Sequence, residues 1–335
     1  MADYINIRGQ SIEVVASDPA NPTQGQIWYN STSNTLKGLG YVAGAWASGG
    51  PMSNVGGIFK ATVGTQTAAL AAGFFTGTPA GVIANTEEYN GSTWTSGGSM
   101  GSALYSGLSA GSQTSAIATG GNDGSGVVSS STESYNGTSW SAETTLPGRN
   151  YGAGAGTSET TAILFCGSGG PFGGPPDFSE TQHYDGSTWT AGGNYPTTQR
   201  NLGGCGTSTT ALGVGGSNPA TANVNEYDGT SWSSHSTLPA IRSSLGCCGN
   251  PTDALVFSGE IPGTGSTNST VLWDGVSWTS QGNLNDAVVA YCGFNRTQST
   301  SSLGFKYGGS SPGGYLSSSE EWTGGAPATQ TITAS

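Results

Sequence analysis

Tyr89-Asn-Gly-Ser-Thr-Trp94 is the stretch that decides the fold, because the chain repeats it. Four further copies of the pattern aromatic–Asn/Asp–Gly–x–x–Trp begin at Tyr135, Tyr184, Tyr227 and Trp273. A degenerate copy precedes them at Tyr41, and a truncated one follows, in which Trp322 takes the place of the tyrosine. These first aromatics are 43 to 49 residues apart, so seven marks enclose six repeats. A fixed period of this length is typical of a β-propeller or another repeat array.

Each repeat follows one plan, which residues 201–232 show most clearly. Its parts are a strand of small residues (201–206), a second strand (211–216), a variable loop, a third strand (224–227), a tight turn (228–231) and a fourth strand that begins at Trp232. We expect Asn-Gly or Asp-Gly to supply the positive φ values of the turn. The flanking aromatics become cross-strand neighbours. Four antiparallel strands per repeat predict an all-β, six-bladed propeller.

The ends of the chain decide how the last repeat is completed. Its third strand ends at Trp322, so its fourth must come from 329–334 or from 46–50. We favour 46–50, because Trp46-Ala-Ser-Gly-Gly-Pro-Met copies Trp94-Thr-Ser-Gly-Gly-Ser-Met. The expected divisions are an N-terminal arm and hairpin (1–40), the propeller (41–325) and a C-terminal tail that is the alternative closing strand (326–335).

The first 40 residues lie outside the repeat. Residues 17–25 are a turn-rich linker with two prolines, and 26–37 read as a β-hairpin. The apolar residues between Ile5 and Val15 predict one further strand. Because a lone hairpin is marginal in water, we expect it to pack on something else.

Composition excludes several classes of function. The net charge of −12 leaves no basic stripe for nucleic acid and disfavours anionic membranes. We find no apolar leader in residues 1–19 and no run of 18 apolar residues, so we expect synthesis in a cytosol without membrane insertion. Five cysteines without a secretory signal predict free thiols.

Three of the cysteines stand at one position of the repeat. Cys205, Cys248 and Cys292 align with Val63, Ala110 and Ala155 of the other repeats. A thiolate metal cluster is one reading. We favour a site for any small apolar residue, since structural zinc normally uses close Cys-x2-Cys pairs. The prediction is no metal and no cofactor.

The repeats resemble kelch repeats, in which a Gly-Gly pair closes the second strand and a Tyr and a Trp follow. The pairs that carry the resemblance are Gly120-Gly121, Gly169-Gly170, Gly215-Gly216 and Gly308-Gly309. Two repeats depart, with Ala72-Gly73 and Ser258-Gly259. The resemblance covers about residues 41–325 and implies a binding scaffold.

The segment Asn21-Pro-Thr-Gln-Gly-Gln-Ile-Trp-Tyr-Asn-Ser-Thr-Ser-Asn-Thr-Leu-Lys37 resembles a short module near the start of tail-fibre and other virion proteins of tailed, especially marine, bacteriophages. The resemblance implies a virion structural component that is made in the host bacterial cytoplasm. It also implies partners among the tail or capsid proteins, and several copies or a homo-oligomer in the particle. The residues expected to dock are Ile27, Trp28, Tyr29 and Leu36.

Catalytic sets of propeller enzymes do not fit the residues. Some kelch propellers are copper oxidases, but His183 and His235, the two histidines, fall on outer strands. Sialidase Asp-boxes have one residue between Asp and Gly, which Tyr184-Asp-Gly lacks. We find no Ser-His-Asp set and no phosphate loop. We therefore predict that the protein is not an enzyme.

Binding candidates gather where the fourth-to-first and second-to-third connections emerge together. They are Arg149, Arg200 and Arg242, with Phe172 and Phe178 of the long loop 168–178. Each arginine either binds a ligand or satisfies carbonyl or carboxylate groups between blades. Each phenylalanine either contacts a ligand or anchors its own loop. We place recognition of a host glycan or receptor on this face.

The prediction for function is a tail-fibre, appendage or decoration protein of a tailed phage, which binds host surfaces multivalently. Two alternatives stay open. One is a glycan-binding lectin without a virion role, and the other is a hydrolase or lyase that acts on surface polysaccharide.

Overall fold

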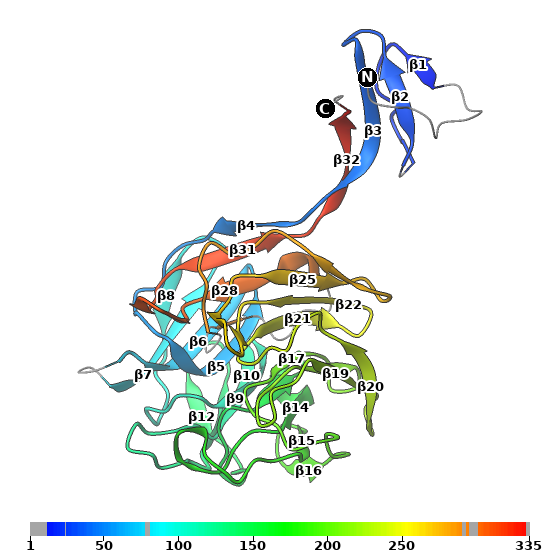
Figure 1. Ribbon diagram of the computed structural model, residues 1–335. Helices are drawn as coiled ribbons and strands as arrows, with labels where there is room; N and C mark the ends of the chain where they lie inside the picture. The colour runs from blue at the N-terminus through cyan, green and yellow to red at the C-terminus, as the bar shows by residue number, and fades with distance from the viewer. Residues whose placement is uncertain (1–11, 24, 78–80, 290–292, 295–300, 333–335) are drawn as a thin grey trace. The chain divides into compact units, whose positions relative to one another are not determined.

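The computed structural model describes residues 12–23, 25–77, 81–289, 293–294 and 301–332 (Figure 1). The chain divides into two compact units. The terminal unit comprises residues 1–44 and 324–335, and the main unit comprises 45–323. Strands dominate both units, so the fold is all-β. The helical segments of the described residues are three 3-10 turns, η1 (Glu159–Thr161), η2 (Pro171–Gly173) and η3 (Ser301–Leu303).

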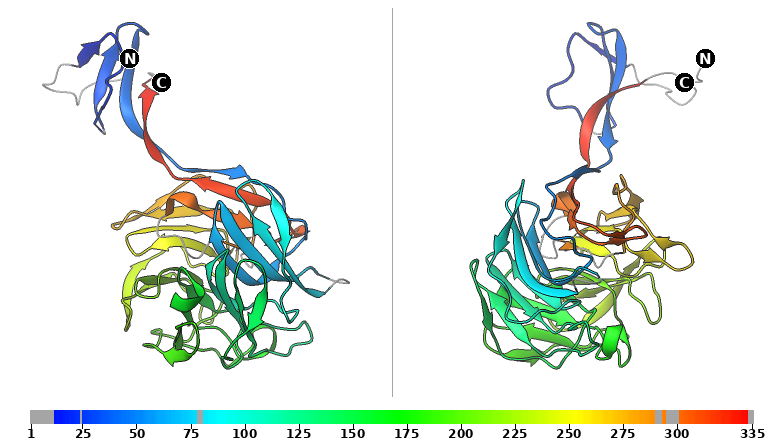
Figure 2. Two further views of the ribbon diagram at one scale, coloured as in Figure 1. Left: turned by 180° about the vertical axis from the view of Figure 1, so that it is seen from behind. Right: turned by 90° about the vertical axis from the view of Figure 1, so that its left-hand side faces the viewer.

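Both ends of the chain build the sheet of the terminal unit (Figures 1 and 2). Its strands are, in spatial order, β1 (Glu13–Val15), β2 (Ile27–Asn30), β3 (Thr35–Val42) and β32 (Ala326–Thr331). The predicted hairpin is confirmed as β2 and β3, and β1 joins it in parallel. The C-terminal tail pairs with β3 from Lys37–Thr331 to Val42–Ala326, and it does not complete the last repeat.

Asp18 of the linker contacts one face of this sheet. Trp28 is fully buried, and its indole Nε1 donates to Asp18 Oδ1 at 3.0 Å. The same carboxylate accepts from Asn30 and is paired with Lys37 at 2.8 Å. These contacts hold the pKa of Asp18 at about 2, chiefly through Lys37. The linker residue Asp18 thus ties the linker to one face of the sheet.

The main unit contains six four-stranded antiparallel sheets in its described residues. Sheet 1 is β5 (Ile58–Thr65), β6 (Ala68–Phe75), β7 (Val82–Tyr89) and β8 (Trp94–Gly97). Sheet 2 is β9 (Leu108–Ser112), β10 (Ser115–Thr119), β11 (Thr132–Tyr135) and β12 (Trp140–Ala142). Sheet 3 is β13 (Ala153–Ala155), β14 (Ala162–Phe165), β15 (Thr181–Tyr184) and β16 (Trp189–Ala191).

The remaining sheets follow the same plan. Sheet 4 is β17 (Gly203–Gly206), β18 (Ala211–Val214), β19 (Asn223–Tyr227) and β20 (Trp232–Thr237). Sheet 5 is β21 (Gly246–Asn250), β22 (Asp253–Phe257), β25 (Thr270–Trp273) and β26 (Trp278–Ser280). Sheet 6 is β27 (Gly293–Phe294), β28 (Phe305–Tyr307), β31 (Ser319–Thr323) and β4 (Ala45–Ser48). Short hairpins are β23 (Glu260–Ile261) with β24 (Gly265–Ser266), and β29 (Ser310–Ser311) with β30 (Gly314–Tyr315).

Sheet 6 takes its fourth strand from the N-terminal side of the chain. Figure 1 shows β4 beside β31. Trp322 of β31 pairs with Trp46 of β4, and their rings lie 5.4 Å apart. The preference for residues 46–50 over the C-terminal tail is therefore confirmed.

The hexapeptide is the turn between third and fourth strands, as predicted. Tyr89 pairs directly with Trp94, and the other copies repeat this register. The turn geometry differs from the expectation, because only the glycine is left-handed, at φ +93° for Gly91. Asn90 instead accepts hydrogen bonds from the backbone N–H of Ser92 and Thr93. Its role is that of an Asx turn, which Asp performs equally well in later copies.

The tryptophans of the hexapeptides join neighbouring sheets. Trp140 Nε1 donates to Thr86 Oγ1 of sheet 1 at 2.9 Å, and Trp232 Nε1 donates to Thr181 Oγ1 of sheet 3 at 2.8 Å. Trp46 of sheet 6 reaches Thr270 of sheet 5 in the same way, at 2.9 Å. These three indoles each contact the third strand of the sheet before their own, whereas Trp278 Nε1 donates to Ser236 Oγ of β20, the fourth strand of sheet 4.

The tyrosines of the hexapeptides also reach the preceding sheet. Tyr184 Oη donates to Glu143 Oε2 at 2.9 Å, and Tyr135 Oη donates to Glu88. Tyr89 of sheet 1 donates to Glu321 of sheet 6 at 2.5 Å, so the last sheet contacts the first. Burial and the bonded Glu321 raise the pKa of Tyr89 to about 12.

We expect these tyrosines to make the protein sensitive to alkali. A tyrosine has an ordinary pKa of 10.0. When folding raises this pKa, the tyrosine stabilises the protein fully as long as the pH is below 10. This stabilisation is lost as the pH rises towards about 12. The urea midpoint should therefore fall over this interval, in step with the tyrosinate absorbance. In Tyr89→Phe the urea midpoint should fall less between pH 10 and about 12 than in the parent protein. A parent protein whose urea midpoint does not change over this interval would contradict the prediction.

Both residues of the glycine pair that ends the second strand have a left-handed backbone conformation. Gly120 and Gly121 have φ values of +68° and +102°. In sheet 3 the equivalent residues are Cys166 and Gly167, at +61° and +105°, and the assignment of this role to Gly169-Gly170 is wrong. The pair Gly169-Gly170 lies inside the long loop, where neither residue is left-handed.

Candidate functional site

The loop face is the edge of the main unit that carries the fourth-to-first and second-to-third connections. The two kinds of connection pair through their backbones. Asn150 and Ser168 exchange N–H···O bonds of 2.8 Å in both directions, and Ser217 N donates to Arg200 O at 2.8 Å. The expectation that these connections share an edge is confirmed. The hexapeptide turns pack at the other end of the sheets, where Gly91 lies against Thr67 of the first-to-second turn.

Arg149 and Arg242 are buried at the base of the loop face. Each is 4% exposed. Arg149 Nη1 donates to the carbonyls of Cys166 and Glu180 at 3.4 and 3.5 Å. Arg242 Nη1 donates to Ser269 O at 3.2 Å, and burial lowers its pKa to about 10. Both arginines thus take the carbonyl-satisfying role, one of the two that the sequence left open.

Arg200 lies differently from the other two arginines. Its side chain is 23% exposed, and its Nη1 is 3.3 Å from Asp177 Oδ1 in the long loop. Asp177 also accepts a hydrogen bond from Asn218 of the next second-to-third connection. Arg200 therefore braces the long loop and still presents part of its guanidinium to solvent. It is the arginine of the three whose position suits contact with a ligand.

The two phenylalanines of the long loop have separate positions. The ring of Phe178 lies 5.0 Å from Arg149 Cζ, a cation–π contact that anchors the loop. Phe172 is 60% exposed and left-handed, at φ +51°, and its ring lies beside Gly126 of the neighbouring connection. An exposed aromatic ring in a strained backbone is suited to contact a partner.

An aromatic cluster on the loop face was missed by sequence reasoning. The ring of Phe75 lies 5.0 Å from Tyr105 and 5.6 Å from Tyr315. Burial raises the pKa of Tyr105 to about 12, and the nearby Tyr151 and Tyr315 contribute. Phe75 ends β6 of sheet 1, Tyr105 and Tyr151 lie in two fourth-to-first connections, and Tyr315 lies in the β29–β30 hairpin of sheet 6. A signal was available, because Tyr105 occupies the repeat position of Asn150 and Arg200.

A run of left-handed residues links the sheets beneath this cluster. Ser106, Tyr151, Asn201 and Ser244 have φ values of +57°, +54°, +55° and +49°. Tyr151 N donates to Ser106 O at 2.9 Å, and Asn201 N donates to Tyr151 O at 2.8 Å. Ser244 N then donates to Asn201 O at 2.6 Å. Each left-handed residue costs about 1–2 kcal/mol. The backbone hydrogen bonds between neighbouring sheets offset this cost and hold these residues in the left-handed conformation.

Some polar atoms on the loop face have no protein partner. Asn122 Nδ2, Asn150 Oδ1 and Gln199 Oε1 are buried without one. Buried polar atoms of this kind are normally met by bound water or a ligand. The face therefore has hydrogen-bonding capacity that the described residues do not use.

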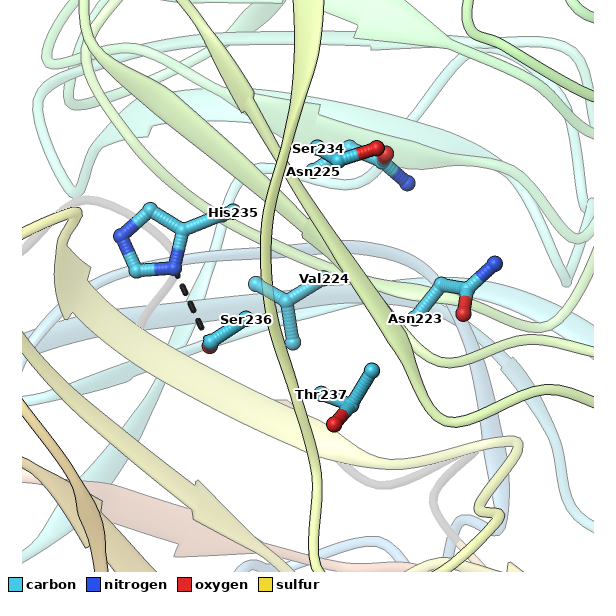
Figure 3. Close-up of a pocket in the computed structure, with 7 residues that line it drawn as sticks. All are labelled: Asn223, Val224, Asn225, Ser234, His235, Ser236 and Thr237. Carbon is cyan, nitrogen blue, oxygen red and sulfur yellow. Dashed lines mark hydrogen bonds between the residues drawn. The ribbon is translucent and has the colours of Figure 1, made fainter.

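Two pockets lie on the outer strands and hold the histidines separately. The first, of about 350 Å³, is lined by residues 223–225 and 234–237 of β19 and β20 (Figure 3). His235 Nδ1 there lies 3.1 Å from Ser236 Oγ. The second, of about 490 Å³, contains His183, whose Nε2 is 2.8 Å from Tyr227 Oη. The two histidines therefore line different pockets.

The predicted docking residues fall on both faces of the terminal sheet. Ile27, Tyr29 and Leu36 share a face, since Tyr29 pairs with Leu36 and strand side chains alternate. Trp28 lies on the opposite face and is fully buried, so its side chain is not part of the face that carries the other three. Val14, paired with Tyr29, and Ile332, beside Gly38, extend the first face, which sequence reasoning did not foresee. We call Val14, Ile27, Tyr29, Leu36 and Ile332 the apolar face.

Comparison with known proteins finds no matching family model and no matching curated protein. Within the described ranges, no group of three or more His, Cys, Asp or Glu residues is placed to hold a metal ion. No described helix is both long and apolar enough to cross a membrane. Cys205 is buried beside Cys247 in one apolar cluster, Cys248 is buried in another, and Cys292 lies outside the described residues.

Proposed function

We propose that the main unit is a six-bladed propeller of the kelch type. Six consecutive four-stranded sheets support this proposal, as do the tryptophan and tyrosine bonds from each sheet to the one before. Contact between the last and first sheets supports a closed ring, because Phe305 of sheet 6 stacks on Tyr89 of sheet 1 at 4.7 Å.

We further propose that the protein is a structural component of a tailed-phage virion, attached through its terminal unit. The observation that carries the proposal is the apolar face. Val14, Ile27 and Ile332 on this face are 66%, 38% and 40% exposed. The unit is compact by itself and includes the segment 21–37 with its resemblance to virion proteins. A tail or capsid protein would cover this face, and the loop face would be displayed towards the host.

The attachment test changes one exposed valine in each unit. Val14→Asp places a charge on the apolar face, and we expect it to lower incorporation into particles at least about tenfold, since a buried unpaired charge is costly. Val276→Asp is the matched control, because Val276 is 84% exposed in a hexapeptide turn of the main unit. Incorporation is measured by quantitative immunoblot of purified particles. Equal incorporation of Val14→Asp and the parent protein would remove the attachment proposal.

Host binding by the loop face would be multivalent and non-enzymatic. Phe172 and the exposed part of Arg200 favour a carbohydrate or protein receptor, because aromatic rings and guanidinium groups recur in such contacts. Many copies on one particle would convert weak single contacts into high avidity. No nucleic acid partner is proposed, given the net charge of −12.

The receptor test compares two exposed apolar residues on opposite faces. We expect Phe172→Ala to reduce binding of the purified protein to host cells or glycan arrays about tenfold or more, as for a central aromatic contact. Val276→Ala is the control and should bind as the parent does. Undiminished binding by Phe172→Ala would exclude the loop face as the receptor-binding site. Binding without any incorporation into particles would instead favour a lectin, and depolymerised polysaccharide would favour an enzyme.

A further inference from the structure

Two cysteines of neighbouring sheets meet in the core of the main unit. Cys205 lies on β17 of sheet 4 and Cys247 on β21 of sheet 5, and both are fully buried. Their Sγ atoms are 2.8 Å apart. The strands approach closely because Gly203 has no side chain, and a Cβ added there would lie 3.1 Å from Cys247 Cβ. The two thiols thus face each other across the boundary between sheets.

Packing alone does not require sulfur at these positions. The glycines Gly156 and Gly206, which are left-handed at φ +129° and +104°, align the repeats. By this alignment the equivalent pair between sheets 3 and 4 is Ala155 and Gly204. A pair of thiols therefore stands where an alanine and a glycine are sufficient.

The distance between the sulfur atoms distinguishes two kinds of chemistry. Two thiolates on one tetrahedral zinc lie about 3.8 Å apart, given a Zn–S length of about 2.3 Å. The observed 2.8 Å is shorter, and the described residues offer no further ligands around the pair. A disulfide has an S–S length of about 2.05 Å, so the observed separation is nearer to that of a disulfide than to that of a zinc-bridged pair.

We propose that Cys205 and Cys247 form a disulfide that joins sheets 4 and 5. The oxidant is a small-molecule disulfide such as oxidised glutathione. One cysteine, as thiolate, attacks a sulfur of the oxidant and releases one glutathione thiolate. The second cysteine, also as thiolate, attacks the mixed disulfide and releases the other. Two protein thiols are oxidised to the disulfide, one glutathione disulfide is reduced, and the two glutathione thiolates take up the two protons that the protein thiols lose.

Burial determines when this reaction occurs. Burial raises the pKa of the Cys205 thiol, and the neighbouring Cys247 adds to the effect. The attacking species is the thiolate, so the folded protein reacts slowly. The bond forms while sheets 4 and 5 are separated, during folding or transient opening. This inference does not depend on the function proposed above.

The experiment refolds the full chain from urea with oxidised glutathione. Free thiols are then alkylated under denaturing conditions, and unreduced peptides are mapped by mass spectrometry. We expect alkylated cysteines to fall from five to three, with one peptide pair joined through Cys205 and Cys247. The oxidised protein should melt at least about 5 °C above the reduced one, and a reductant should reverse this rise.

Single variants assign the bond. Cys248→Ser removes the adjacent thiol, which packs in a different cluster, and this variant should still lose two thiols. Cys247→Ala should lose no free thiol on oxidation. If this variant does not fold, the peptide map of the oxidised parent protein still tests the proposal. Refolded parent protein with all five cysteines alkylated would overturn the proposal. A linked peptide through Cys248 in place of Cys247 would overturn it equally.

Discussion

Glu133→Ala should destabilise the main unit by about 3–5 kcal/mol, because it leaves a buried ammonium group without its counter-charge. Lys60 of β5 and Glu133 of β11 form an ion pair of 2.8 Å between sheets 1 and 2. Their side chains are 0% and 6% exposed. Burial lowers the pKa of Lys60, and Glu133 opposes that shift. Glu133 Oε2 also accepts the Gly101 N–H at 2.6 Å, so the variant loses two contacts.

Urea unfolding at neutral pH measures this loss, and two further variants test its cause. The double variant Lys60→Met/Glu133→Leu removes both charges and should be more stable than Glu133→Ala. Glu226→Ala removes a partly exposed glutamate from β19 and should cost less than about 1 kcal/mol. A Glu133→Ala loss as small as that of Glu226→Ala would show that the pair is not a stabilising link between sheets.

Gly120→Ala should cost about 3 kcal/mol or more, near the top of the usual range for single substitutions. Gly120 is left-handed, at φ +68°, and a Cβ there would overlap the carbonyl oxygen of Arg149. The backbone carbonyl cannot move without disturbing the first strand of sheet 3. The variant therefore combines backbone strain with a clash between neighbouring sheets.

Gly263→Ala separates these two effects. Gly263 has a similar φ of +81°, but a Cβ there would meet nothing within 4 Å. Its cost should be only the backbone term, about 1–2 kcal/mol. Chemical denaturation of both variants provides the comparison. Equal losses would mean that the sheets adjust to the added methyl group, and that the close approach at Gly120 is not needed.

The repeat architecture could be predicted because its signals are local and periodic. Tyr89 and Trp94 flank a four-residue turn, so their pairing follows from the spacing alone. Trp46 could be assigned to sheet 6 because the segment that begins at Trp46 matches the segment that begins at Trp94. A fixed period thus carried information across almost the whole chain.

The failures share a different cause. Gly169-Gly170 matched the expected pair in composition, but the left-handed positions belong to Cys166-Gly167. A backbone conformation that usually selects glycine accepts cysteine here, and composition does not reveal such an exception. The tail was kept only as an alternative closing strand, and its pairing with β3, outside the periodic region, was not foreseen.

The site was predicted less well than the fold, because burial decides the role of a side chain. Arg149, Arg200 and Arg242 occupy neighbouring connections, yet two are buried on carbonyls and one is partly exposed. Their separation depends on contacts that are remote in sequence. The same holds for Cys247, whose partner Cys205 belongs to another sheet and was aligned instead with Cys248.

The pairing of β3 with β32 has a consequence for the order of events during translation. The two strands come from residues 35–42 and 326–331, so the ribosome must synthesise the whole main unit after β3 before β3 meets its partner. Domains generally begin to fold while synthesis continues, but this sheet cannot be completed then. Leu36 of the apolar face precedes the main unit in the sequence, and Ile332 follows it. A product terminated within the main unit would therefore lack β32 and part of the apolar face.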